Sequence, residues 1–377
     1  PLRDYRSRCV VPVPPRISLL RTVAQTLALF LALTPLSPAL ADQQAWRSEW
    51  MSPQAETEAN SWWCYRTTFD CPEPDGEITA RIACDSKYWL WINGELGDFE
   101  GGVKRGPTPR GTYHDTVDLT ARFGRGENTV AVLVWHFGKD GMSHKNSGRV
   151  GLLFDVLREG RPLIRDARWR AIRHPAYGAT GPPHPNWRLP ESNVAFDARL
   201  DLADWRQPGF DASAWPEVVA AGTPPAGPWG EVVAPGLPPV RCTAPRAYEY
   251  AEELPTVSDG TPIVARLPLN MAVTPLLDIE ADAGLRIGIR TDNYRGGSEP
   301  NVRAEYTPRD GRQTHESLGW KNGHEVVYTI PVGVKVHGLR YRESGYDTDL
   351  AGSFECSDTR LNTLWRKAQR TLYVAMR

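Results

Sequence analysis

Three acidic residues in alternation form the one stretch of this sequence that could hold a cation. Asp278, Glu280 and Asp282 occupy every second position, which places them on one face of a β-strand. Carboxylate oxygens are the ligands that Ca²⁺ prefers. Nothing else in the stretch completes a coordination set, so we interpret the three side chains as a solvated sheet face and expect no metal.

Patterns typical of other hydrolytic chemistry are absent from the sequence. The pairs His315-Glu316 and His324-Glu325 lack the spacing of a zinc peptidase. Neither a serine-hydrolase elbow nor a dinucleotide fingerprint occurs. Glycoside hydrolysis uses two carboxyl groups that flank the bond, and the sequence pairs none of its 45 acidic residues. We therefore assign no catalytic residue and no cofactor to this chain, and its substrate-binding residues stay unknown.

Three tryptophans and two loops could contact a ligand. Trp89, Trp91 and Trp135 offer flat faces that can stack on pyranose rings, but buried aromatic side chains more often fill a core. We favour the core interpretation, because such side chains bury large apolar areas. The glycine-rich loop at 97–106 and the loop at 136–147 are the places where this region could assist a distant active site.

Composition indicates an ordinary globular protein. The chain is 41% hydrophobic and 24% charged, with a formal net charge of −1, which supports neither nucleic acid nor an anionic membrane as a partner. It contains 33 Gly, 33 Pro and 14 Trp; many turns with many aromatics favour β-sandwich modules. Its 377 residues suggest two or three domains.

Residues 1–41 are predicted to be a signal peptide. A basic start precedes an apolar run at 22–33, and Ala39-Leu40-Ala41 has the small-x-small form of a cleavage site. An uncleaved anchor is the alternative, but the run is shorter than the roughly 20 residues of a membrane span. We expect a bacterial protein that is exported to the periplasm or secreted, with no membrane attachment after cleavage.

The cysteines leave two interpretations open. Cys64, Cys71 and Cys84 fall in or beside strand candidates. In an oxidising compartment one bridge among them is plausible, and small buried thiols are the alternative. No zinc spacing occurs among cysteines and histidines.

Residues 42–165 and 241–352 are predicted to form two antiparallel β-sandwiches. Short, evenly spaced strand candidates in such numbers are typical of that architecture. In the first region they lie at 61–69, 77–84, 87–92, 113–119, 128–136 and 150–157; in the second, at 263–268, 276–280, 285–290, 302–307, 324–330 and 336–343.

Residues 166–240, between these regions, are predicted to wrap over the first sandwich. Their prolines disfavour helix and central strand. Four tryptophans, at positions 187, 205, 215 and 229, argue for order instead of disorder.

Residues 353–377 are predicted to contain a helix. Ser357 and Asp358 are good N-caps, and apolar residues then recur at spacings of three and four: Leu361, Leu364, Trp365, Ala368, Leu372 and Ala375. A helix with such a face is stable only when the face is packed. We infer that the chain is a fragment and that a helical domain follows.

These C-terminal residues resemble a known family. The runs LRYRESGYDT at 339–348, GSF at 352–354, SD at 357–358 and LNTLW at 361–365 are similar to the joint between the β-sandwiches and the helical barrel of bacterial α-L-rhamnosidase-like proteins of glycoside hydrolase family 78. The pattern from Asp85 to Gly94 resembles a galactose-binding-like jelly roll. The fold implied is mainly β: two antiparallel sandwiches (jelly-roll, galactose-binding-like), then the first helix of an (α/α)6 barrel absent from this chain.

The resemblance also implies a function. The parent protein would remove terminal α-L-rhamnose from glycans or glycosides, with an inverting acid and base that lie in the barrel. Its partner would be that carbohydrate substrate, and this region itself is expected to be inactive. The alternative is a carbohydrate-binding or adhesion module without hydrolysis.

Overall fold

The computed structural model describes residues 45–55, 57–101, 111–141, 144–164, 167–182, 193–241, 243–293 and 302–376. From Trp46 onward, these residues form one compact unit. The predicted signal peptide at 1–41 lies outside the described residues. So do Trp187, positions 102–106 of the glycine-rich loop and positions 142–143 of the second loop.

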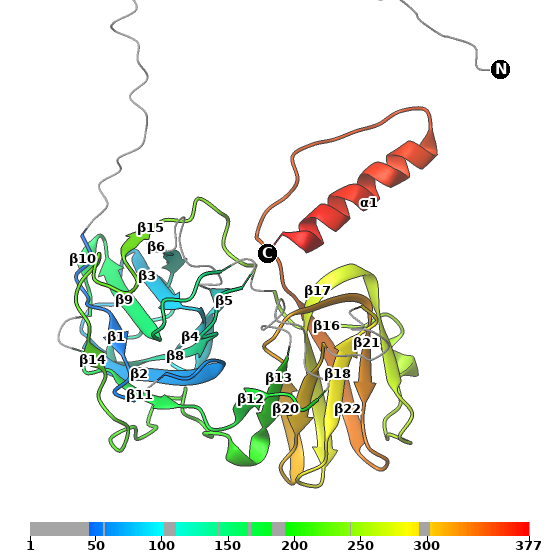
Figure 1. The fold of residues 1–377 in the computed structure, drawn as a ribbon, viewed down its shortest axis with the longest axis horizontal. Coiled ribbons are helices and arrows are strands. Elements are labelled where there is room, and N and C mark those ends of the chain that lie inside the picture. The colour runs from blue at the N-terminus through cyan, green and yellow to red at the C-terminus, as the bar shows by residue number, and fades with distance from the viewer. Residues whose placement is uncertain are drawn as a thin grey trace, which may run out of the picture. The chain divides into compact units, whose positions relative to one another are not determined.

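Two antiparallel sheets make the first sandwich (Figure 1). One has the order β14-β1-β9-β3-β7 with β10 beside β9, and the other has the order β11-β2-β8-β4-β5. The strands are β1 (Met51–Ser52), β2 (Ser61–Cys71), β3 (Ile78–Asp85), β4 (Lys87–Ile92), β5 (Glu95–Gly101), β7 (Asp115–Asp118), β8 (Gly126–His136), β9 (Gly151–Arg158), β10 (Arg161–Pro162), β11 (Arg170–Arg173) and β14 (Val219–Ala220).

The central strands of the second of these sheets are buried on both faces. Alternate residues such as Tyr65, Leu90 and Val132 face the core between the sheets. Their neighbours Trp89 and Leu133 belong to another buried cluster, on the opposite face. A strand covered on both sides needs a nearly continuous apolar sequence, which is what β2, β4 and β8 have.

The hairpin from β4 to β5 corrects one prediction from the sequence. Asn93 and Gly94 both have positive φ, at 52° and 82°, as a two-residue hairpin turn requires. The chain then pairs with β4 as far as Gly101. Residues 97–101, predicted as the start of a loop, are therefore strand, because the turn brings them beside β4.

One nine-stranded sheet, folded on itself, makes the second sandwich. Its order is β12-β13-β19-β18-β21-β17-β22-β16, with β20 also paired to β17. The strands are β12 (Tyr177–Ala179), β13 (Val194–Asp197), β16 (Arg246–Ala247), β17 (Ile263–Ala281), β18 (Ile287–Thr291), β19 (Ala304–Thr307), β20 (Gly311–Glu316), β21 (Lys321–Thr329) and β22 (Lys335–Glu343). Its core includes Ala265, Val273, Ile289, Tyr306 and Tyr328.

The long strand β17 connects the two halves of this sheet. Its pairing with β21 shifts register between Arg266 and Met271, and its C-terminal half pairs with β20 and β22. The sequence predicts two strands here, at 263–268 and 276–280. They are one strand, because the register shift accommodates the intervening irregularity without ending the ladder.

Tryptophans anchor the segment that follows β13. The segment contains the 3-10 helix η2 (Ala198–Leu200) and strand β15 (Glu231–Val233), which pairs in parallel with β6 (Gly111–Tyr113). Trp205, Trp215 and Trp229 are buried. The Trp229 ring stacks on Trp50 with 4.5 Å between ring centroids.

A second 3-10 helix, η3 (Ala251–Glu253), precedes β17, and α1 (Thr359–Ala375) is the single α-helix of the described residues. Asp358 caps α1, because its carboxylate accepts a hydrogen bond from the Arg360 N–H at 2.9 Å. Arg370 Nε donates to the Asn270 carbonyl at 2.8 Å, which ties α1 to β17.

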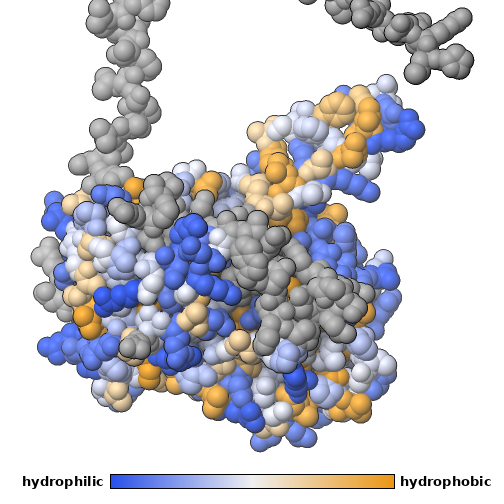
Figure 2. Space-filling model, viewed as in Figure 1, coloured by the Kyte–Doolittle hydropathy of each residue, from blue (hydrophilic) through white to orange (hydrophobic). Residues whose placement is uncertain are grey.

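Most of the predicted apolar face of α1 is exposed. Leu361, Leu364 and Leu372 have exposed fractions of 47%, 62% and 56%, and apolar surface gathers on this helix in Figure 2. In the described part of the chain, none of the helices has the length and apolar character to cross a membrane. The predicted fold class, mainly β with sandwiches and one C-terminal helix, is confirmed.

Candidate functional site

The alternating carboxylates of β17 form ion pairs. Asp278 accepts hydrogen bonds from the Arg312 guanidinium at 3.1 and 2.9 Å, and Glu280 Oε1 lies 2.7 Å from Lys335 Nζ. The hydrogen bond from Arg312 lowers the pKa of Asp278. Within the described residues, no group of three His, Cys, Asp or Glu side chains could hold a metal ion. The stretch is a charged sheet surface.

The three candidate tryptophans have different environments. Trp89 and Trp135 are fully buried, and both stack on Trp62, with 5.5 and 4.4 Å between ring centroids. Trp91 retains 8% exposure and lines a cavity. Two of the three therefore fill the interior, and one reaches a place that a ligand could occupy.

The described cysteines are all free thiols. Cys64, Cys71 and Cys84 are buried, and Cys356 is half-buried. Burial raises the pKa of Cys64 and of Cys84, so neither thiol is poised to react. Of the two interpretations of these cysteines, the structure shows the buried thiols.

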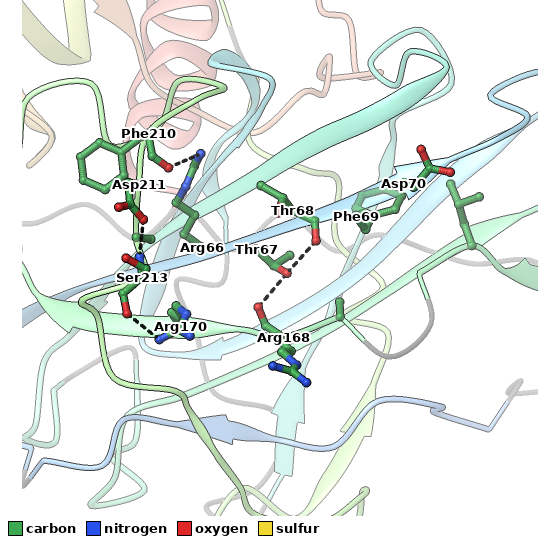
Figure 3. A pocket seen from close by; sticks show the side chains of 13 residues that line it. Arg66, Thr67, Thr68, Phe69, Asp70, Arg168, Arg170, Phe210, Asp211 and Ser213 are labelled. Atoms are coloured by element: carbon green, nitrogen blue, oxygen red, sulfur yellow. Dashed lines mark hydrogen bonds between the residues drawn. The ribbon is translucent and has the colours of Figure 1, made fainter.

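Two larger cavities remain as candidate sites. The first, which we call the arginine groove, has a volume of about 710 Å³ and lies between residues 66–70 of β2, residues 167–170 and residues 210–213 (Figure 3). Arg66 donates to the carbonyls of Trp205 at 3.1 Å and Gln207 at 3.0 Å. Arg170 donates to the carbonyl of Ser213 at 3.0 Å. These two guanidinium groups hold the segment after η2 against the sandwich, which is a structural role.

The second cavity, which we call the aromatic cavity, has a volume of about 340 Å³. Parts of the chain that are distant in sequence form its walls. Its aromatic residues are Trp91, Phe99, Tyr177, Phe196, Trp205 and Tyr306, and its charged or titratable residues are His174, Asp201, Arg206, Arg309, His315, Glu316 and Arg342.

Asp201 and Arg206 bring opposite charges to one wall of the aromatic cavity. The carboxylate of Asp201 lies 3.4 Å from His174 Nε2. Burial acts to raise the pKa of Asp201, but the hydrogen bond from His174 and the nearby Arg206 hold it below its usual value. The guanidinium of Arg206 lies over the Trp91 ring, 4.9 Å from its centroid.

The cavity also contains a neutral imidazole. The His315 ring stacks on both Phe196 and Tyr306, with ring centroids at 4.8 and 4.3 Å. Burial lowers the pKa of His315 to about 3. The ring is therefore uncharged at neutral pH, with one nitrogen that donates and one that accepts.

A buried ion pair of the first sandwich is hydrogen-bonded to the second sandwich. Lys87 Nζ lies 2.6 Å from Glu100 Oε1, and both side chains are almost fully buried. The other oxygen of Glu100 accepts a hydrogen bond from Ser344 Oγ, just after β22. Nearby, Glu316 binds the Arg342 guanidinium at 2.9 and 3.2 Å.

Sequence reasoning did not find this site. It considered His315 only as part of a zinc motif, and it did not single out Asp201 or Arg206. Asp201 and His315 are more than 100 positions apart in the sequence. No motif spacing connects either of them with Arg206. Two signals in the sequence fall in this cavity: Trp91, and Phe99 of the glycine-rich loop at 97–106.

Comparisons with known proteins support the fold. No family model and no curated protein sequence matches the chain. The solved structure of a GH78 family rhamnosidase of Bacillus sp. GL1 matches with a TM-score of 0.71 at 18% identity, over 88% of this chain and 58% of that one. The α-L-rhamnosidase of Streptomyces avermitilis, complexed with L-rhamnose, matches with a TM-score of 0.64 at 20% identity, over 84% of this chain and 32% of that one.

A third match, α-L-rhamnosidase from Aspergillus terreus, has a TM-score of 0.64 at 17% identity, over 84% of this chain and 38% of that one. The chain thus spans less than two thirds of the length of each of these enzymes. At such identities the likeness shows the fold. The resemblance of residues 339–365 is confirmed at that level: the chain has the fold of the matched part of GH78 α-L-rhamnosidases.

Proposed function

We propose that this chain is the N-terminal, non-catalytic region of an exported glycoside hydrolase that removes terminal α-L-rhamnose from glycans or glycosides. The observation that carries the proposal is the match to a GH78 rhamnosidase over 88% of this chain but only 58% of that protein. The remaining part of such an enzyme is where we place catalysis.

One pair of neighbouring carboxyl groups in the described residues could be considered as a catalytic pair, but its surroundings argue against that role. The pair is Asp98 and Asp115, whose carboxylates both bind the Tyr88 hydroxyl, at 2.8 and 3.0 Å. The cavity beside them has a volume of about 50 Å³, far below the roughly 300 Å³ at which small-molecule sites begin. A cavity of that size is too small for a sugar ring.

We also propose that the enzyme inverts the configuration at the anomeric carbon. An inverting glycosidase needs a protonated acid and a second carboxylate that activates water, about 6.5–9.5 Å apart. We place both in a helical domain that packs on the exposed face of α1, where Leu361, Leu364 and Leu372 offer apolar surface. Export through a signal peptide at 1–41 would deliver the enzyme to the periplasm or the medium.

Activity of the parent protein, expressed from its natural reading frame, tests the proposal. We expect release of p-nitrophenol from p-nitrophenyl α-L-rhamnoside, β-rhamnose as the first product by NMR, and no release by the 377-residue chain alone. Release from a different glycoside only would refute the assigned sugar. α-Rhamnose as the first product would refute inversion, and activity of the chain alone would refute its non-catalytic role.

A binding or adhesion module without hydrolysis is the second candidate. The aromatic cavity is the observation that favours it. A folded parent protein that binds a saccharide but cleaves none of a panel of p-nitrophenyl glycosides would support this candidate over the first.

A further inference from the structure

We propose that the aromatic cavity binds one sugar ring of a glycan. The choice of a saccharide rests on the proposed function, and the cavity itself rests on geometry. Three features of the described residues carry the inference: the size of the cavity, its aromatic side chains and its polar side chains.

The size fits one ring. A volume of about 340 Å³ lies at the small end of the roughly 300–1,000 Å³ typical of small-molecule sites. The arginine groove is larger, but two of its three arginines, Arg66 and Arg170, already donate to backbone carbonyls. The aromatic cavity has charged and polar side chains of several kinds.

Tyr177, which is half-buried, and Trp91, which retains 8% exposure, supply apolar contact area for the C–H faces of a pyranose. Trp91 and Trp205 meet edge to face, with ring centroids 5.9 Å apart, and Tyr177 stacks on the buried Trp62 at 4.1 Å. Rings held by neighbouring rings lose little further entropy when a ligand binds. The wall is therefore preorganised.

The polar groups match vicinal hydroxyl groups. A carboxylate accepts and a guanidinium donates, so Asp201 and Arg206 can bind two adjacent hydroxyls of one ring. The neutral imidazole of His315 can donate and accept, and its ring makes no hydrogen bond to the described residues. A hydrogen bond to a charged group contributes more than one between neutral groups, which favours a polyhydroxylated ligand over an apolar one.

Other ligand classes fit less well. A cation would need several free carboxylates, but Glu316 is held by Arg342 and by the Thr274 hydroxyl at 2.8 Å. A doubly charged phosphate could bind Arg206 and Arg309 but would face the ionised Asp201, so phosphate is the competing class in the test below. A neutral sugar meets neither obstacle.

Equilibrium binding to the 377-residue chain tests the proposal. The probes are L-rhamnose, methyl α-L-rhamnoside, D-galactose and D-glucuronate, with inorganic phosphate as the competing class, measured by calorimetry and ligand-observed NMR. Arg206→Ala removes the donor, and Thr314→Trp fills the cavity from an exposed position on β20. Arg312→Ala is the matched control, since Arg312 lies on the same strand and pairs with Asp278 outside the cavity.

We expect saturable binding of at least one sugar, weakened at least tenfold by Arg206→Ala, abolished by Thr314→Trp and unchanged by Arg312→Ala. Circular dichroism confirms that each variant is folded. No saturable sugar binding, binding of phosphate alone, or equal affinity in the wild type and Arg206→Ala would overturn the proposal. Sugar binding without hydrolysis by the parent protein would defeat only the proposed function, and hydrolysis without binding at this cavity would defeat only the present inference.

Discussion

The substitution Lys321→Met is expected to stabilise this protein, and to do so in a pH-dependent way. Lys321 is fully buried on β21. Its ammonium group donates to the Gly319 carbonyl at 3.1 Å and to Ser317 Oγ at 3.4 Å, both of which are neutral partners. Burial without a counter-charge lowers the pKa of Lys321 from 10.5 to about 7.

The size and sign of the effect follow from the two pKa values. A lowered pKa means that the folded state disfavours the charged form of Lys321. The free energy of unfolding of the wild type is therefore highest above pH 10.5, and the contribution of the uncharged lysine is lost as the pH falls to about 7. Each pKa unit corresponds to about 1.4 kcal/mol, so the full penalty is about 5 kcal/mol. Methionine avoids this penalty but forgoes two hydrogen bonds, each contributing about 1 kcal/mol. A net gain of about 3 kcal/mol remains at pH 6.

Denaturant unfolding of the wild type and the variant between pH 6 and pH 10 measures the effect. The difference in unfolding free energy should be largest at pH 6 and should fall by about 4 kcal/mol toward pH 10. Lys335→Met, which removes an exposed lysine paired with Glu280, serves as the control and should change stability by less than about 1 kcal/mol. A difference between wild type and Lys321→Met that stays constant over this range would refute the reasoning, because it would mean that Lys321 does not change its charge there.

Three further predictions concern other parts of the molecule. Glu100→Gln leaves the buried Lys87 without its counter-charge and should cost about 3–5 kcal/mol in urea unfolding; a loss below about 1 kcal/mol would contradict a dry ion pair. Asp358→Ala removes the cap of α1, so amides of its first turn should exchange with solvent several-fold faster, corresponding to about 1 kcal/mol, while amides of β8 stay unchanged. Cys356 should react with a thiol reagent in the native protein and Cys64 only after denaturation; a Cys64 that stays blocked until a reductant is added would reveal a disulfide instead.

Local features of the fold were predictable from short stretches of sequence. Alternating apolar residues mark β3, the Asn93-Gly94 pair marks the hairpin after β4, and Asp358 marks the start of α1. In each case the cause acts within a few residues: side chains alternate across a strand, a turn needs positive φ, and a carboxylate caps a free N–H.

Features that depend on long-range pairing were not predictable in this way. The strand β20 was missed because Gly311–Glu316 is largely polar, and it is strand because β17 pairs with it from Leu276 to Ala281. The continuous β17 was divided in the prediction. Residues 97–101 were predicted as loop, although they pair with β4.

The sequence by itself determined the fold class, the cap and apolar face of α1, and the family resemblance, because each depends on neighbouring residues. Only the tertiary structure decided which side chains meet. Trp91, Asp201 and His315 share one cavity because β4, η2 and β20 are packed together, and Glu100, which pairs with Lys87 across the β4–β5 hairpin, meets Ser344 because the two sandwiches pack on each other. Contacts between segments 100 or more residues apart follow from strand pairing and packing, and no local spacing in the sequence records them.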